Sequence, residues 1–113
     1  MAEHPRFYEL LEEMRRIHDK KNSDYSKSGD PLSNFRLCED FGIPAWMGVI
    51  VRISDKYSRI TQLASKILQG ENAAVKDESL KDTLIDLANY SLLAIILLEE
   101  WLKSKKAKVN ASR

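Results

Sequence analysis

The chain has 113 residues, which is enough for one domain with a core of its own. Hydrophobic residues make up 43% of it and charged residues 31%, a balance that excludes a disordered, fibrous or membrane-embedded chain. The formal net charge is only +1, so no overall field draws the protein to nucleic acid or to an anionic membrane. We therefore expect a single domain over residues 1–113 whose function depends on a local site.

The cysteine content and the apolar segments indicate where in the cell the protein is located. Cys38 is the only cysteine, which excludes an internal disulfide and a zinc site built from cysteines. The first residues are acidic where a secretory signal has basic residues and then an apolar run. The longest apolar segment, residues 83–98, is too short to cross a bilayer. We expect a cytoplasmic protein that does not contact a membrane.

The first predicted helix runs from Pro5, which suits the first helical position, to about Lys20. Its apolar residues recur at helical spacing: Phe7, Leu10, Leu11, Met14 and Ile17. Residues 21–42 then predict a long loop with one short helix near residues 31–40. A loop of this length is usually functional or disordered, and its aromatic residues argue against disorder.

The second predicted helix follows the break at residues 42–44 and ends at Gly70. Its predicted apolar stripe consists of Trp46, Ile50, Ile53, Tyr57, Ile60, Ala64 and Ile67. After a connector, the third helix begins with Asp77 as the N-cap, has Glu78 in its first turn and continues to about Lys105. The basic tail, residues 106–113, is expected to fray.

Three long helices and one short helix predict an all-α fold. The expected architecture is an antiparallel bundle of about four helices, completed by oligomerisation with further copies of the chain. The basic tail has no interleaved aromatic residues, so nucleic acid is not an expected partner.

The third helix contains the most informative polar residues. Glu78, Asp82, Asp86 and Asn89 are spaced to line one stripe of it. The neighbouring residues are apolar around almost the whole circumference, which predicts burial: Leu84, Ile85, Leu87, Ala88, Leu92, Leu93, Ile95 and Ile96. A buried carboxylate at Asp86 needs a cation, a metal or a proton, because burying an unpaired charge is too costly.

The second helix supplies charged residues for this carboxylate, and two interpretations remain open. In the structural one, Lys56 or Arg59 pairs with Asp86, and the charges stabilise the fold. In the functional one, carboxylates bind Mg²⁺ while Lys56 and Arg59 neutralise the phosphates of a nucleotide. The metal ligands would then be Asp55, Glu78, Asp82 and Asp86.

Four segments in this order carry a family resemblance: KKNSDY at 20–25, SNFR at 33–36, SDKYSR at 54–59 and ESLKDTLIDLANY at 78–90. They resemble the phage nucleotide-modification-associated domain, a small helical family. A looser similarity links the chain to the MazG-like and dimeric dUTPase all-α pyrophosphohydrolases. This second resemblance implies a homo-oligomer that uses Mg²⁺ to hydrolyse a nucleoside triphosphate to a monophosphate and pyrophosphate.

The resemblance to the pyrophosphohydrolases is incomplete at the acidic residues. Those enzymes present an ExxE pair on one helix and an ExxD pair on the next. Asp82 and Asp86 resemble the second pair, although they are four residues apart instead of three. Of the first pair only Asp55 is present, so the implied catalytic residues are Asp55, Asp82 and Asp86. Either Glu78 replaces the missing acid, or the protein binds a nucleotide without cleaving it.

The resemblance also implies residues that bind the substrate. Asn89 resembles an asparagine that contacts the sugar or base, Tyr25 and Phe35 would stack on a base, and Asn34 would bind its edge. The implied set is Lys20, Asp24, Tyr25, Asn34, Phe35, Lys56, Arg59, Asn89 and Tyr90. The alternative from another class is a non-catalytic helical module for oligomerisation, with structural charges and an apolar third helix.

Overall fold

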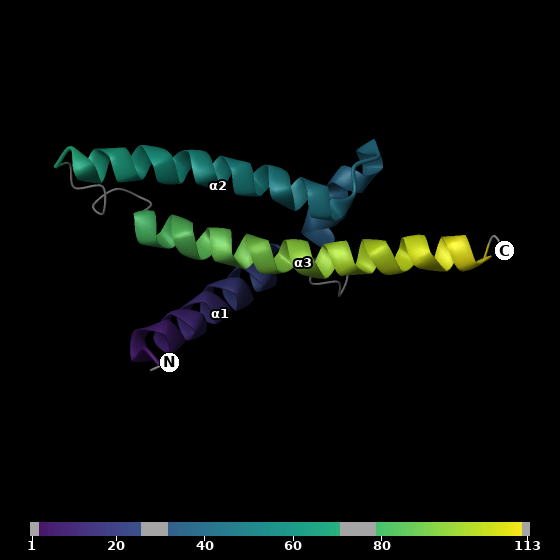
Figure 1. Ribbon diagram of the computed structural model, residues 1–113, viewed down its shortest axis with the longest axis horizontal. Helices are drawn as coiled ribbons and strands as arrows, with labels where there is room; N and C mark the ends of the chain where they lie inside the picture. Colours follow the sequence, from purple (N-terminus) through teal and green to yellow (C-terminus); the bar gives the residue numbers. More distant parts are fainter. Residues whose placement is uncertain (1–2, 26–31, 71–78, 112–113) are drawn as a thin grey trace. The chain divides into compact units, whose positions relative to one another are not determined.

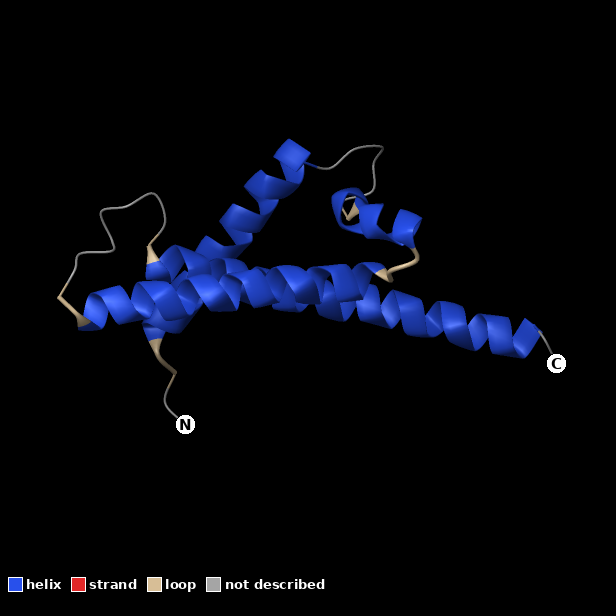
Figure 2. Ribbon diagram, turned by 90° about the horizontal axis from the view of Figure 1, so that it is seen from above, coloured by secondary structure: helices blue, strands red, loops and turns tan. Residues whose placement is uncertain are grey.

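The computed structural model describes residues 3–25, 32–70 and 79–111 (Figure 1). Every regular element in these ranges is a helix, as the colouring in Figure 2 makes plain. In chain order they are α1 (Pro5–Tyr25), the 3-10 helix η1 (Ser33–Phe41), α2 (Ala45–Leu68) and α3 (Leu80–Ala111). The predicted all-α fold is confirmed. None of the helices in the described ranges has the length and apolar character needed to span a membrane.

The chain divides into two compact units, Met1–Asn34 and Phe35–Arg113. In the first unit, the start of α1 is organised around two short-range contacts. The backbone N–H of Phe7 donates to the carbonyl of His4 at 2.9 Å, and that of Arg6 donates to the His4 ring at 3.2 Å. These bonds use donors that a helix N-terminus leaves without partners inside the helix.

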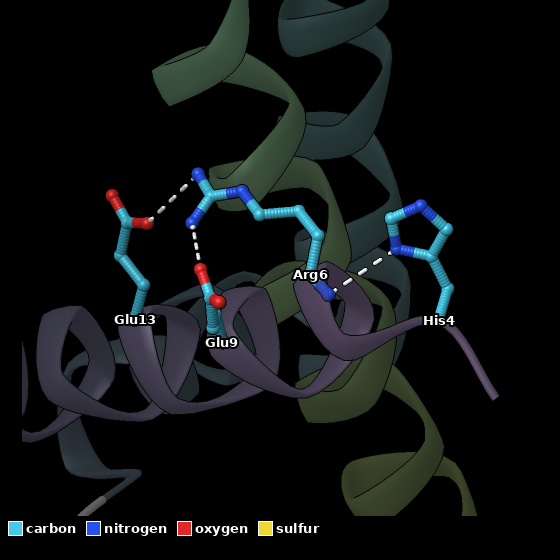
Figure 3. A network of polar contacts seen from close by, with 4 residues as sticks. All are labelled: His4, Arg6, Glu9 and Glu13. Carbon is cyan, nitrogen blue, oxygen red and sulfur yellow. Dashed lines mark hydrogen bonds and ion pairs between the residues drawn. The ribbon is translucent and has the colours of Figure 1, made fainter.

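An exposed ion-pair network follows on the first turns of α1 (Figure 3). The Arg6 guanidinium lies 2.9 Å from Glu9 and 3.9 Å from Glu13. Surface pairs of this kind each contribute about 0.2–1 kcal/mol, because water already solvates both charges well. The network therefore adds only modest stability to the start of α1.

The end of α1 differs from the prediction. The helix was expected to end near Lys20, but it continues to Tyr25. Asn, Ser and Asp disfavour a helix only mildly, and the first glycine or proline after Lys20 is Gly29. The polar composition of residues 21–25 was therefore too weak a signal for a helix end.

The second unit is built on the antiparallel pair of α2 and α3. Trp46 near the start of α2 contacts Trp101 late in α3, and Lys56 further along α2 contacts Asp86 early in α3. Both helices contribute to the core of this unit, whose buried apolar residues are Ala45, Val49, Ile85, Leu93 and Leu97.

The ends of α2 agree with the prediction, but its buried face does not. The helix begins after Pro44 and ends before Gly70, whose φ of +85° is readily available only to glycine. Val49 is buried, whereas Ile50, Tyr57 and Ile67 of the predicted stripe are exposed. Apolar residues lie all around the first turns of α2, so their spacing did not determine which side faces α3.

Both ends of α3 differ from the prediction. The predicted N-cap Asp77 lies outside the described residues, and the helix begins at Leu80 with Ser79 as its cap. The Ser79 hydroxyl accepts a hydrogen bond from the backbone N–H of Asp82 at 3.1 Å. At the other end the helix extends to Ala111 instead of fraying from residue 106. Lysine and alanine favour a helix, and lysines near its C-terminus interact well with the helix dipole.

The predicted burial of α3 is confirmed on only one side. Asp86, Leu93 and Leu97, which share one face of the helix, are buried, and Asp86 contacts Lys56 on α2. Several apolar residues expected to be buried are instead about half exposed: Leu84, Leu92, Ile95 and Ile96.

Candidate functional site

A nearly buried ion pair joins the two long helices of the second unit. The ammonium of Lys56 on α2 lies 3.1 Å from a carboxylate oxygen of Asp86 on α3. The side chains are only 16% and 10% exposed, respectively. The predicted burial of Asp86 is thus confirmed, and Lys56 is the cation placed against it.

Two aromatic rings and a second cation extend this pair. The Lys56 ammonium lies 5.8 Å from the centre of the Tyr90 ring. Tyr90 packs edge-to-face against Phe35, with ring centres 6.1 Å apart and an interplanar angle of 80°. The Arg52 guanidinium lies 4.9 Å from the centre of the Phe35 ring. We refer to these five residues, including Asp86, as the cation–aromatic cluster.

Helical spacing explains how the sequence builds this cluster. Arg52 and Lys56 are four residues apart on α2, as are Asp86 and Tyr90 on α3, so each pair occupies neighbouring turns of one helix face. The antiparallel packing of α2 and α3 brings the two pairs together. Phe35, from η1, supplies the remaining ring.

The charges of the cluster do not cancel. With two cations and one carboxylate, the cluster has a formal net charge of +1. A cation over an aromatic face gains electrostatic stabilisation from the ring. The cluster is therefore suited to an anion that also has a planar ring.

Cys38 positions η1, and with it Phe35, next to α2. Its sulfur is within hydrogen-bonding range of the carbonyls of Phe35, at 3.8 Å, and Pro44, at 3.7 Å. A Cβ atom added at Gly48 would lie 2.6 Å from this sulfur, too close for any real contact. Glycine at this position lets η1 approach the first turns of α2.

The predicted acidic residues occupy different environments. Asp86 is buried, whereas Asp55 and Asp82 are exposed, and Glu78 lies outside the described residues. Thr83, next to Asp82, is fully buried, and its hydroxyl donates to the Ser79 carbonyl at 3.1 Å. The first turns of α3 thus combine an exposed acid with a buried polar side chain.

The described residues do not assemble a metal site by themselves. Across the three described ranges, no group of three or more His, Cys, Asp or Glu side chains could hold a metal ion. Asp86 is also already neutralised by Lys56. A Mg²⁺ site made of Asp55, Glu78, Asp82 and Asp86 stays a prediction, and it would need Glu78 or a second chain.

The predicted substrate-binding residues fall in both units. Phe35, Lys56 and Tyr90 come together in the cation–aromatic cluster. The second unit also contains Asn89, which is half-buried, and Arg59, which is exposed. In the first unit, Lys20 is exposed and Asn34 is half-buried, while the side chains of Asp24 and Tyr25 lie outside the described residues.

Sequence reasoning left two arginines out of the candidate site. Arg52 belongs to the cluster, and its position one turn before Lys56 was the available signal. Arg36 lies 3.0 Å from Glu100 and connects η1 to α3. These two residues are 64 positions apart, so no local pattern could have predicted their contact.

Residues 21–98 match the family model described as Nucleotide modification associated domain 1. The chain belongs to this family. The matched segment contains all five residues of the cation–aromatic cluster. The resemblance to this family is thereby confirmed, and the similarity to MazG-like enzymes stays a prediction. No curated protein and no solved structure shows significant similarity to the chain.

Proposed function

We propose that the protein binds a nucleoside phosphate at the cation–aromatic cluster. The observation that carries this proposal is the stacking of Arg52 and Lys56 on Phe35 and Tyr90, within a group that has a net positive charge. Arginine and lysine are the usual side chains that bind phosphate, and aromatic rings stack on any base. The family's name, which refers to nucleotide modification, supports the same class of ligand.

The basic residues of α2 define where the phosphates would bind. Arg52, Lys56 and Arg59 follow one another at spacings of four and three residues, so they lie on successive turns. They span about 10 Å along the helix at 1.5 Å per residue. This length matches a chain of linked phosphates. Lys56 would be the central contact, held in place by Asp86.

A reaction can be added to this proposal. The similarity to the pyrophosphohydrolases, in which Asp82 and Asp86 resemble one of the two acidic pairs, supports Mg²⁺-dependent hydrolysis of a nucleoside triphosphate to a monophosphate and pyrophosphate. The pairing of Asp86 with Lys56 favours the second candidate, binding without turnover, because this carboxylate already has a cation. Both candidates bind the same ligand, but only the first releases a product.

One experiment tests both candidates. Thermal unfolding is measured with and without Mg²⁺ and with a panel of ribo- and deoxyribonucleoside triphosphates, and pyrophosphate is assayed in the same wells. A ligand at 100 times its Kd stabilises the folded state by about 2.7 kcal/mol, which raises the Tm by several degrees. We expect the shift with at least one nucleotide.

Variants test whether the nucleotide-induced shift in Tm depends on the cation–aromatic cluster. Arg52→Gln should reduce the nucleotide-induced shift, whereas Lys66→Gln, which removes a cation from the far end of the same helix, should leave it unchanged. Pyrophosphate release would establish hydrolysis, and a shift without product would establish binding alone. The absence of a shift with every nucleotide would overturn the proposal and leave the charges with a structural role.

A further inference from the structure

The charges of this chain are separated along the sequence. All 17 acidic residues precede residue 101, whereas residues 101–113 include five basic residues and no acidic one. The overall net charge of +1 therefore conceals a strongly positive segment. An asymmetry of this kind is typical of proteins that bind a polyanion.

The structure shows that most of this segment is helical. We refer to residues 102–111 as the basic arm, which contains Lys103, Lys105, Lys106 and Lys108. The arm is the end of α3, a continuous helix that reaches Ala111. Trp101 packs against Trp46, the second residue of α2, so the antiparallel helix α3 continues past the start of α2 at the arm (Figure 1 and Figure 2). The helix therefore fixes on which side of the arm each lysine lies.

The acidic residues nearest to the arm along α3 offset only part of its charge. Glu100 lies 3.0 Å from Arg36, which neutralises it. Glu99 is four residues before Lys103 and can pair with it, as is common on helix surfaces. When Arg36, Glu99 and Glu100 are counted with the four lysines, this end of α3 still has a formal net charge of +3.

Other parts of the chain do not cancel this charge. The 3-10 helix η1 contains Glu39 and Asp40, but no ion pair joins these two to the lysines of the arm within the described residues. Three of the lysines lie about 8–12 Å beyond Glu100 along the helix axis, at 1.5 Å per residue. The unit Met1–Asn34 has seven acidic and six basic residues, so its own charge is nearly balanced.

The helix dipole accounts for only part of the lysine content. Lysines near the C-terminus stabilise a helix, but this effect falls off within the last turn. Lys108 is the basic residue of the last turn of α3, and the other three lysines lie earlier. The dipole therefore gives no reason for those three.

The four lysines form two pairs on opposite sides of the arm. Lys103 and Lys106 are three residues apart, as are Lys105 and Lys108, so the members of each pair are neighbours on the helix surface. At 3.6 residues per turn, the two pairs are about 160° apart around the axis. This arrangement suits a groove that has anionic groups along both of its walls. A membrane surface contacts one side of a helix only, and it requires a broad apolar face there.

We propose that the basic arm binds double-stranded DNA by lying in the major groove. The major groove is about 12 Å wide and an α-helix with its side chains is about 10–12 Å across, so the two lysine pairs would contact the phosphates of both strands. Contacts to phosphates carry no direct sequence information, so we expect little dependence on base sequence. The major groove of duplex RNA is too narrow for this arrangement. The arm is separate from the cation–aromatic cluster, and this inference does not depend on the proposed nucleotide site.

The first test measures binding of the full chain to a short, end-labelled DNA duplex of mixed sequence by fluorescence anisotropy. Three to four phosphate contacts predict a slope of about −2.7 to −3.6 for log K against log salt concentration. The affinity should therefore fall about 40- to 150-fold between about 50 and 200 mM salt. The absence of binding at the lower salt concentration would overturn the proposal.

The second test assigns the binding to the arm. Lys103→Gln/Lys106→Gln and Lys105→Gln/Lys108→Gln each remove one pair and should each reduce the magnitude of the slope by about 1.8. The matched control Lys66→Gln/Lys81→Gln removes the same charge from positions outside the arm and should leave the slope unchanged. Circular dichroism verifies that all three variants are folded. An equal reduction in the control, or an effect of only one lysine pair, would overturn the proposed binding mode.

The third test distinguishes duplex DNA from other polyanions. Duplex RNA of the same sequence and vesicles with anionic lipids are titrated under the same conditions, and both should bind at least about tenfold more weakly than the DNA. Equal binding of the RNA would contradict the placement of the arm in the major groove. Preferential binding of the vesicles would overturn the assignment of DNA as the partner.

Discussion

The cation–aromatic cluster and the contact between Trp46 and Trp101 are two versions of one arrangement on the same helix pair. Each combines an edge-to-face pair of rings with a cation over a ring. The tryptophan rings have centres 5.6 Å apart and an interplanar angle of 65°, and the Lys105 ammonium lies 5.2 Å from the Trp101 ring centre. The cluster differs by its buried carboxylate, which lies 3.1 Å from Lys56.

This difference is the reason why we place the proposed binding site at the cluster and not at the tryptophan contact. Cation–aromatic contacts occur about once per 70–80 residues in proteins, so such a contact alone assigns no function. A buried carboxylate requires a specific partner, because an uncompensated charge is very costly there. At the tryptophan contact the buried polar atom is the Trp46 Nε1, which has no hydrogen-bond acceptor within the described part of the chain. That contact therefore has a packing role.

The largest expected effect comes from removing the carboxylate. Asp86→Ala would leave Lys56 nearly buried without its partner and should destabilise the protein by about 3–5 kcal/mol. Chemical denaturation measures this change. Asp82→Ala, at an exposed position one turn earlier, should cost less than about 1 kcal/mol.

A control separates the ion pair from an acidic metal site. Lys56→Met/Asp86→Leu replaces both charges with apolar groups and should recover most of the lost stability, because no buried charge remains unpaired. If Asp86→Ala were instead neutral or stabilising without metal, the carboxylate would be one of several mutually repelling acids, and the structural ion pair would be refuted.

The next largest effect is expected at the tryptophan contact. Trp101→Ala removes a half-buried indole that packs on Trp46 and should cost about 2–3 kcal/mol, less than for a fully buried tryptophan. The nucleotide-induced shift in Tm should persist in this variant. Trp101→Phe, which keeps an aromatic ring, should be closer to wild type. Loss of nucleotide binding in Trp101→Ala, with the fold intact by circular dichroism, would contradict the packing role.

Smaller and equal effects on stability are expected at the two cations that lie over aromatic rings, and nucleotide binding distinguishes them. Arg52→Ala and Lys105→Ala each remove a cation from an aromatic face and should each cost about 0.5–1 kcal/mol. Only Arg52→Ala should weaken nucleotide binding, by about tenfold, because a charged contact to phosphate is lost. Titration calorimetry with the nucleotide found in the thermal screen measures this. Equal weakening in both variants would show that the two regions do not differ in function.

The smallest effect is expected at the contact between η1 and α3. Arg36→Ala breaks a pair whose side chains are 34% and 48% exposed, so the loss should be about 0.2–1 kcal/mol. Denaturation at low and high salt is the measurement, and the loss should shrink as salt screens the charges. A loss that does not depend on salt would indicate that Arg36 contributes by packing.

Several features of the site followed from local patterns. Apolar residues around Asp86 predicted its burial, and the spacing of Lys56 and Arg59 placed two cations on neighbouring turns of α2. The pattern could not decide whether Lys56 or Arg59 pairs with Asp86, because these two cations are only one turn apart. The relative register of α2 and α3 made that choice.

The sequence by itself determined the all-helical fold, the ends of α2 and the need of Asp86 for a compensating partner. These properties depend on local spacing, on proline and glycine, and on the cost of burying a charge. The tertiary structure decided the Lys56 partner, the place of Phe35 between Arg52 and Tyr90, and the exposure of Leu84, Leu92 and Ile95 on α3. Each of these depends on how separate helices pack, and the spacing of residues within one helix carries no information about that packing.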